Sequence, residues 1–327
     1  MKERIEYFDF LRGIAIIGVI AIHTCDGISD NLSVFTRQLF NCSVPIFLAI
    51  SGYFLANKDV SSSDKYYYFL KKQVPRVYLP MLLWSIPFLI LSLFNGQGIF
   101  KSIGGFLIGG YSIYYFVALI LQFYILLPIF QWFANRSGVI ISLLITMGAM
   151  SILFYTNHII GLNLPLIIYA APFPVWMVFF VIGLFVGKKG TSFKPHIPVY
   201  GIIVIVGLLL SFVETSYISQ MKGFLAGAGI KGSATLYSFG VLFLMFSLAT
   251  RYRSNKFTEL ISQLGTLSFG IYLSHMFVIF FVGRIYHGFF EQPWILKVFI
   301  ILGISYIGCF LGYKIHPNLS KRYLGIG

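Results

Sequence analysis

Long runs of apolar residues, each close to 20 residues in length, recur along the whole chain. A helix needs roughly 20 mostly apolar residues to cross the hydrocarbon core of a bilayer. Because 58% of the 327 residues are hydrophobic and only 10% are charged, the chain differs sharply from a soluble domain, in which about 25% are charged. We therefore predict an all-α integral membrane protein with about ten transmembrane helices. The predicted helices lie near residues 10–25, 38–56, 76–95, 111–134, 138–157, 165–187, 197–213, 233–250, 265–285 and 295–314.

The basic residues predict the orientation of these helices. If Met1 is cytoplasmic, 17 of the 24 Lys and Arg residues fall in inner segments, as the positive-inside rule requires for an even number of spans. We expect both termini in the cytoplasm, a cell inner (cytoplasmic) membrane location and one domain over residues 1–327. The net charge of +14 then reflects topology and membrane lipids, and no nucleic-acid partner is expected.

The three cysteines, Cys25, Cys42 and Cys309, have no metal-ligand or CxxC spacing. We therefore expect no metal cofactor. Their role is either small apolar filler or, for Cys25 and Cys42, a disulfide.

Ionisable residues inside a membrane helix are costly, so each is a functional candidate. The first predicted helix contains Asp9, Arg12 and His23. Arg12 and His23 are 11 residues apart, which is about 1100° of rotation and about 16.5 Å of rise, so both lie on one helix face. Arg12 suits a phosphate or carboxylate, and a neutral His23 suits a general base. Asp9 can orient Arg12 through an i,i+3 pair.

Interpretations without a catalytic role also remain open for the first helix. Asp9 and Arg12 could form an interfacial ion pair that only sets the topology, and His23 could reach the outer surface.

Other membrane segments hold further candidates. The Ser51-Gly52 pair favours close helix packing over a nucleophilic role for Ser51. Lys71, Lys72 and Arg76 precede the third helix and could bind a phosphorylated cofactor or anionic lipid headgroups.

The ninth helix places Tyr272 and His275 three residues apart on one face. Alone, such a histidine is equally consistent with a hydrogen-bonded core residue. Pro172 and Pro174 interrupt the sixth span, which indicates a cavity.

These segments, in this order, resemble the bacterial membrane acyltransferase family 3, whose members modify sugars and lipids of the cell envelope. The resemblance covers essentially the whole chain. It rests on the first-helix residues Asp9, Arg12 and His23, on Phe47 with Ser51 and Gly52, on Arg76 with Pro80, on Tyr272, Leu273 and His275, and more weakly on the segments 121–128 and 179–183.

The resemblance implies a transfer of an acyl group, acetyl in the first place, from cytoplasmic acetyl-CoA or another acyl-CoA to a hydroxyl of a cell-envelope saccharide or lipid-linked acceptor. It implies catalytic roles for His23, Arg12 and Asp9 and acyl-CoA binding by Lys71, Lys72 and Arg76. It implies substrate binding by Ser51, Gln122, Tyr124, Tyr272 and His275.

The chain departs from many relatives in two places. Tyr114 and Tyr115 stand where they have a tryptophan, and Ile120 and Leu121 stand where some have a glutamate. A membrane transporter or exporter of a polysaccharide or small molecule is the alternative function, because broken helices with intramembrane charges also describe transporters. A structural or sensory protein with an inactive site is a second alternative.

Overall fold

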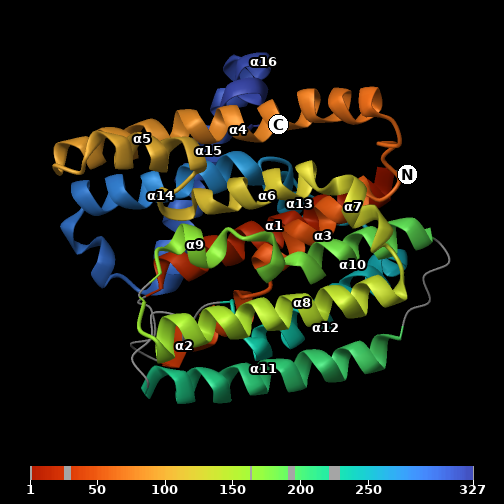
Figure 1. The fold of residues 1–327 in the computed structure, drawn as a ribbon. Helices are drawn as coiled ribbons and strands as arrows, with labels where there is room; N and C mark the ends of the chain where they lie inside the picture. Colours follow the sequence, from red (N-terminus) through yellow and green to blue (C-terminus); the bar gives the residue numbers. More distant parts are fainter. Residues whose placement is uncertain (1, 26–30, 163, 191–195, 221–228, 327) are drawn as a thin grey trace.

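The computed structural model describes residues 2–25, 31–162, 164–190, 196–220 and 229–326. Over this part of the chain every element is helical and there is no strand. Most helices run along a common direction and form one bundle (Figure 1). The all-α fold predicted from the sequence is therefore confirmed for the described residues.

Eleven helices make up most of the bundle. They are α1 (Lys2–Thr24), α2 (Asn31–Phe40), α3 (Ser43–Leu55), α4 (Ser63–Phe94), α6 (Tyr115–Ile125), α8 (Arg136–Phe154), α10 (Met177–Lys189), α11 (Ile197–Gln220), α12 (Gly232–Leu248), α14 (Ser268–Ile285) and α15 (Trp294–Ile315).

Shorter elements connect or brace these helices. They are α5 (Ile99–Ile108), α7 (Leu127–Trp132), α9 (Leu166–Ala170), α13 (Lys256–Thr266) and α16 (Pro317–Leu319), the 3-10 turns Ser112–Tyr114, Phe173–Val175, Ala249–Arg251 and His287–Glu291, and the π turns Tyr155–Ile159 and Ser320–Leu324.

Eight helical segments among the described residues are long and apolar enough to cross a membrane, or nine if the bent pair Ile99–Ile108 and Ser112–Ile125 counts as one span. Eight of the ten predicted ranges coincide with these segments. The range 111–134 is divided between α6 and α7, and the range 165–187 is divided into α9, a 3-10 turn and α10. The number of spans and the side on which each terminus lies stay predictions.

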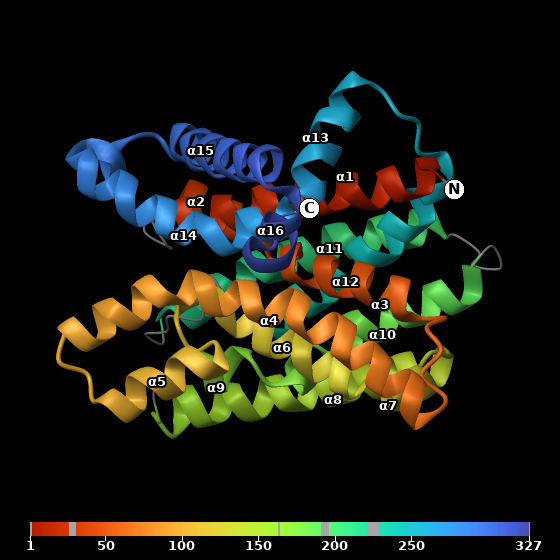
Figure 2. The same cartoon turned by 90° about the horizontal axis from the view of Figure 1, so that it is seen from above.

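Helix α1 lies at the centre of the bundle. It packs against α2, α3, α13, α14 and α15, and 61% of its membrane segment is buried, compared with 11% for α11. Figure 2 shows α13 rising beside α1, and α5 folding back beside α4. Residues that must meet inside the protein are therefore expected on α1, whereas α11 presents apolar side chains outward to lipid.

Helices α3 and α10 approach closely because glycines replace side chains at their contact. A Cβ atom at Gly183 would overlap the carbonyl of Ala49, and one at Gly52 would overlap the carbonyl of Phe180. Small residues allow such backbone contact between membrane helices. The packing role predicted for the Ser51-Gly52 pair is therefore borne out at Gly52.

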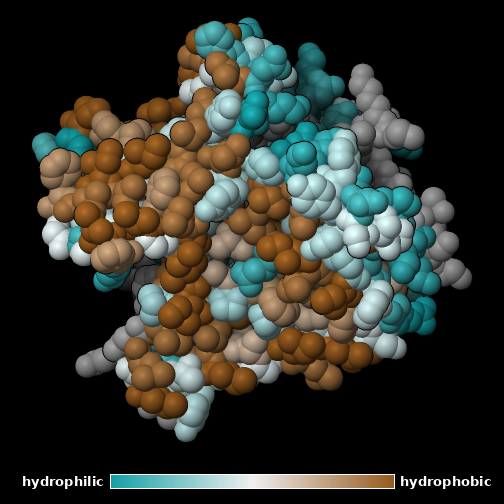
Figure 3. All heavy atoms as spheres, turned by 45° about the horizontal axis from the view of Figure 1, so that its top comes forward, coloured by the Kyte–Doolittle hydropathy of each residue, from teal (hydrophilic) through white to brown (hydrophobic). Residues whose placement is uncertain are grey.

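The face of the protein seen in Figure 3 is largely apolar, with polar side chains gathered toward one end. Figure 3 shows brown, hydrophobic residues over much of the visible face, and teal, hydrophilic residues toward the end at which Figure 1 places the N-terminus. An apolar exterior of this kind requires lipid rather than water around the helices.

Replacing Gly183 by alanine tests the contact between α3 and α10. We expect G183A to lower the melting temperature in detergent, because overpacking at a tight contact costs about 1–3 kcal/mol. Gly148 in α8 is the matched control, since a Cβ atom there meets nothing within 4 Å. A G148A variant should be as stable as wild type or more stable, and equal melting of both variants would contradict the contact.

Candidate functional site

One cavity, here called the basic cavity, has a volume of about 610 Å³ and four cationic side chains in its wall. Phe47, Ser51, Phe116, Tyr124 and Tyr272 also line it. The cations come from four separate parts of the chain, namely Arg12 of α1, Lys58 after α3, Arg76 of α4 and Lys321 near the C-terminus. No Asp or Glu is among the described lining residues, so the cavity favours an anionic ligand.

Arg12 is held in the wall by two neighbours. Its Nη1 donates to Asp9 Oδ1 at 2.8 Å, and its guanidinium lies 5.4 Å from the centre of the Phe54 ring. The i,i+3 pair predicted from the sequence is therefore present. Because Asp9 is outside the cavity wall, it orients Arg12 and leaves the cavity side of the guanidinium available.

Two of the four cations were not predicted as site residues. Gln131 of α7 donates to the carbonyl of Lys58 at 2.8 Å and fixes the chain where Lys58 enters the wall. Near the C-terminus, Trp84 donates to the carbonyl of Leu324 at 3.3 Å, which holds the turn that carries Lys321 against α4. Both residues follow a span by several positions, and nothing in the local sequence indicates these long-range contacts.

The basic cluster before the third predicted helix is only partly in the wall. Arg76 and Gln73 line the basic cavity, whereas Lys71 and Lys72 are exposed and are not among its lining residues. On helix α4 the cluster occupies more than one face, so the lipid-headgroup interpretation fits Lys71 and Lys72 better than cofactor contact.

A second, smaller cavity of about 320 Å³, here called the histidine cavity, contains His23. Arg37 and Asn41 belong to its wall together with Ser112, Tyr115 and Trp176. Its wall contains no Asp or Glu among the described residues. Arg12 and His23 thus line separate cavities along α1; the sequence predicted only that they share one face of the helix.

His275 lies beside His23, with 5.3 Å between the ring centres and 44° between the ring planes. It is fully buried, and its Nδ1 lies 2.7 Å from the carbonyl oxygen of Tyr272. A carbonyl only accepts hydrogen bonds, so Nδ1 carries the proton and Nε2 presents a lone pair. That Nε2 atom is buried without a hydrogen-bond partner among the described residues.

Tyr272 forms part of the wall of both cavities. Its hydroxyl donates to the carbonyl of Ile113, and Tyr114 donates in return to the carbonyl of Leu273 at 2.9 Å. These reciprocal bonds fix α14 to the turn in front of α6. Ser112 in this turn has a φ of +51°, a left-handed conformation that a non-glycine residue adopts at a cost.

Gln122 was predicted to bind substrate, and it is not among the lining residues of either cavity. Its amide donates to the carbonyl of Ala171 at 2.8 Å and accepts from the amide of Phe173 at 3.1 Å. Trp176 similarly donates to the carbonyl of Ala170 at 2.8 Å. Gln122 therefore satisfies the backbone freed at the break around Pro172, and this break forms one wall of the histidine cavity.

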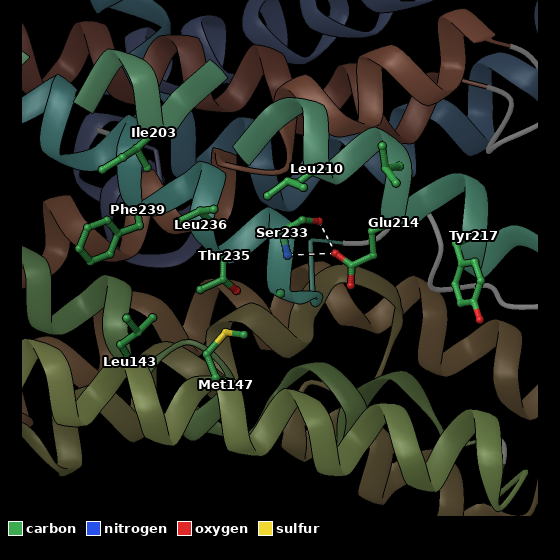
Figure 4. A pocket seen from close by; sticks show the side chains of 12 residues that line it. Leu143, Met147, Ile203, Leu210, Glu214, Tyr217, Ser233, Thr235, Leu236 and Phe239 are labelled. Carbon is green, nitrogen blue, oxygen red and sulfur yellow. Dashed lines mark hydrogen bonds between the residues drawn. The ribbon is translucent and has the colours of Figure 1, made fainter. Parts of the chain in front are cut away.

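A third cavity, of about 670 Å³, lies between α8, α11 and α12 and is almost wholly apolar (Figure 4). Its one acidic residue, Glu214, accepts hydrogen bonds from the amide and hydroxyl of Ser233. The carboxylate is thereby occupied in capping the start of α12. The described wall contains no histidine or cation, and its carboxylate is already hydrogen-bonded to Ser233, so this cavity is a poorer candidate for acid-base or anion chemistry than the other two.

No group of three or more His, Cys, Asp or Glu side chains in the described part of the chain is arranged to hold a metal ion. Cys25, Cys42 and Cys309 are free and buried, which favours the filler role over a disulfide.

Comparison with known proteins adds one finding. A protein-family model described as an acyltransferase domain matches residues 5–314, nearly the whole chain. No curated protein and no solved structure matches the chain.

Substitution of Gln122 tests whether this residue supports the broken helix in the cavity wall or contacts the substrate directly. We expect Q122A to lower the melting temperature in detergent, because each buried backbone group left unpaired costs about 1–3 kcal/mol. Q263A is the control, since Gln263 is exposed and its side chain accepts a long, 3.4 Å bond from Tyr306. An unchanged melting temperature together with weaker substrate binding would instead favour direct contact.

Proposed function

Because the chain belongs to acyltransferase family 3, we propose that it transfers an acyl group, most simply acetyl, from cytoplasmic acyl-CoA to a hydroxyl of a cell-envelope glycan or lipid-linked sugar. The proposal places the protein in the cell inner membrane with both termini in the cytoplasm. One observation carries it: a basic cavity and a histidine cavity meet at Tyr272, and α1 contributes Arg12 to the first and His23 to the second.

The basic cavity suits the donor. Coenzyme A carries several phosphate groups, and Arg and Lys side chains form short, charge-assisted hydrogen bonds with phosphate oxygens. Arg12, Lys58, Arg76 and Lys321 supply four positive charges with no opposing carboxylate in the described wall. Phe47 and Phe116, whose ring centres are 6.3 Å apart, give an apolar surface on which the acyl arm can lie.

The histidine cavity suits the acceptor. In the proposed step, His23 removes the proton from an acceptor hydroxyl, and the hydroxyl oxygen attacks the thioester carbonyl carbon. The C–S bond then breaks, a C–O ester bond forms, and the coenzyme A thiolate leaves and takes up the proton. His23 is exposed to its cavity, so a hydroxyl can reach it.

His275 and Tyr272 complete this arrangement. The ring centres of His23 and His275 are 5.3 Å apart. The lone pair on His275 Nε2 can accept a hydrogen bond from an N–H group of His23 and so orient the His23 ring. Tyr272 stands where the acyl group must pass from one cavity to the other. His275 acts on the reaction through His23 and is a positioning residue.

Turnover of radiolabelled acetyl-CoA by purified protein in liposomes tests this function. We expect H23A to reduce acetyl transfer or acetyl-CoA hydrolysis about 100-fold or more, since a general base contributes 10²–10⁴-fold. R12A, K58A and K321A should raise KM for acetyl-CoA. K256A, at an exposed position outside both cavities, is the charge-matched control.

Two results would contradict the proposal. One is full activity of H23A in a protein that still elutes as a folded monodisperse species. The other is accumulation of a sugar across the membrane with no consumption of acyl-CoA, which is the behaviour expected of a transporter.

A further inference from the structure

Arg37 of α2 lies in the wall of the histidine cavity together with His23. Its Nε atom is buried and has no hydrogen-bond partner in the described part of the chain. The ion pairs of the described residues join Arg12 to Asp9 and Lys65 to Asp59, so Arg37 is not neutralised by either. No described Asp or Glu lines this cavity.

The helix that carries Arg37 is firmly held. The adjacent residue Gln38 is fully buried, and its Oε1 accepts hydrogen bonds from Lys231 Nζ at 2.7 Å and from Ser211 Oγ at 2.6 Å. Tyr237 donates to the carbonyl of Leu39 at 2.8 Å. These contacts from α11, from α12 and from the residue before α12 fix the register of α2 and with it the place of Arg37 in the cavity wall.

A partly buried cation without a counter-charge is costly, and binding an anion removes that cost. The planar guanidinium of arginine matches carboxylate and phosphate groups, which it binds with two parallel hydrogen bonds. A ligand in this cavity of about 320 Å³ can therefore place its anionic group on Arg37 and a hydroxyl on His23.

We propose that the acceptor is anionic, and that Arg37 binds a phosphate or carboxylate group of the sugar whose hydroxyl is acylated at His23. This inference rests on the proposed function, since it defines the charge of the acceptor. A sugar phosphate and a uronic acid are the two sources of such a charge, and the experiment distinguishes them.

Binding without turnover is the first measurement. Trp176 lines the same cavity, so its fluorescence, taken as the difference between wild type and W176F, reports occupancy. At constant ionic strength we expect glucose 1-phosphate or glucuronate to change this signal and glucose to leave it unchanged. The anion that binds more tightly identifies the source. Equal responses to glucose and both anions would overturn the proposal.

Variants of Arg37 provide the second arm. Loss of a hydrogen-bonded charge pair corresponds to about 1.5–3 kcal/mol, so R37Q should weaken binding of the anionic sugar roughly 10- to 100-fold. R37K should retain part of the affinity, because lysine keeps the charge and loses the paired geometry. R284Q is the control, since Arg284 lies over the Phe280 ring outside the cavity. Unaltered binding by R37Q would overturn the proposal.

Asp26 and Asp30 fall outside the described residues, so a double variant tests whether these two carboxylates account for the charge effect assigned to Arg37. The double variant D26N/D30N should bind glucose 1-phosphate within about twofold of wild type. A change as large as that caused by R37Q would assign the charge effect to this segment and overturn the proposal.

Kinetics with two acceptors separate anion binding from stabilisation of the transition state. With acetyl-CoA as donor, R37Q should raise KM for the anionic sugar by a much larger factor than it raises KM for methyl glucoside. An equal fall in kcat for both acceptors would mean that Arg37 stabilises the developing oxyanion, and the proposal would be wrong. Absence of turnover in wild type would defeat the proposed function alone, because the fluorescence measurement still tests Arg37.

Discussion

The close approach of α1 and α13 determines where the chemistry of this protein lies. A Cβ atom at Gly13 would overlap the carbonyl of Ile261, and one at Gly265 would overlap the carbonyl of Asp9. Since Gly265 is the penultimate residue of α13, this contact also places the start of α14 beside α1. Glycine is required here because two backbones are in contact, and any side chain would force the helices apart.

Beyond that contact α1 and α14 pack against one another and bring polar side chains together. Arg12 lies at the level of the crossing, and His23 lies 11 residues further along α1. On α14, His275 reaches the level of His23, as the 5.3 Å between their ring centres shows, and Tyr272 stands one turn before it. A polar path inside an apolar bundle therefore comes from one pair of helices rather than from loops, which gives it a fixed geometry.

The sequence could predict those features that depend on a single helix. The common face of Arg12 and His23 and the pair formed by Asp9 and Arg12 follow from helical periodicity. Lys58, Lys321 and Arg37 could not be predicted as cavity residues, because contacts distant in sequence place them there. Gln122 shows the opposite case: its position matched a motif, and only the bonds to Ala171 and Phe173 reveal that it supports a broken helix.

The two cavities share an electrostatic character despite their different sizes. Neither has a carboxylate among its described lining residues, and each contains arginine. In a medium of low dielectric constant these charges act over a longer range than in water, so each cavity is preorganised for an anion before the ligand enters. A neutral acceptor would leave Arg37 without a counter-charge among the described residues, whereas an anionic acceptor would pair with it and would bring its hydroxyl to His23 in a defined orientation. The arginine therefore serves to select and orient the acceptor, and the choice of hydroxyl follows from the distance between the anionic group and that hydroxyl.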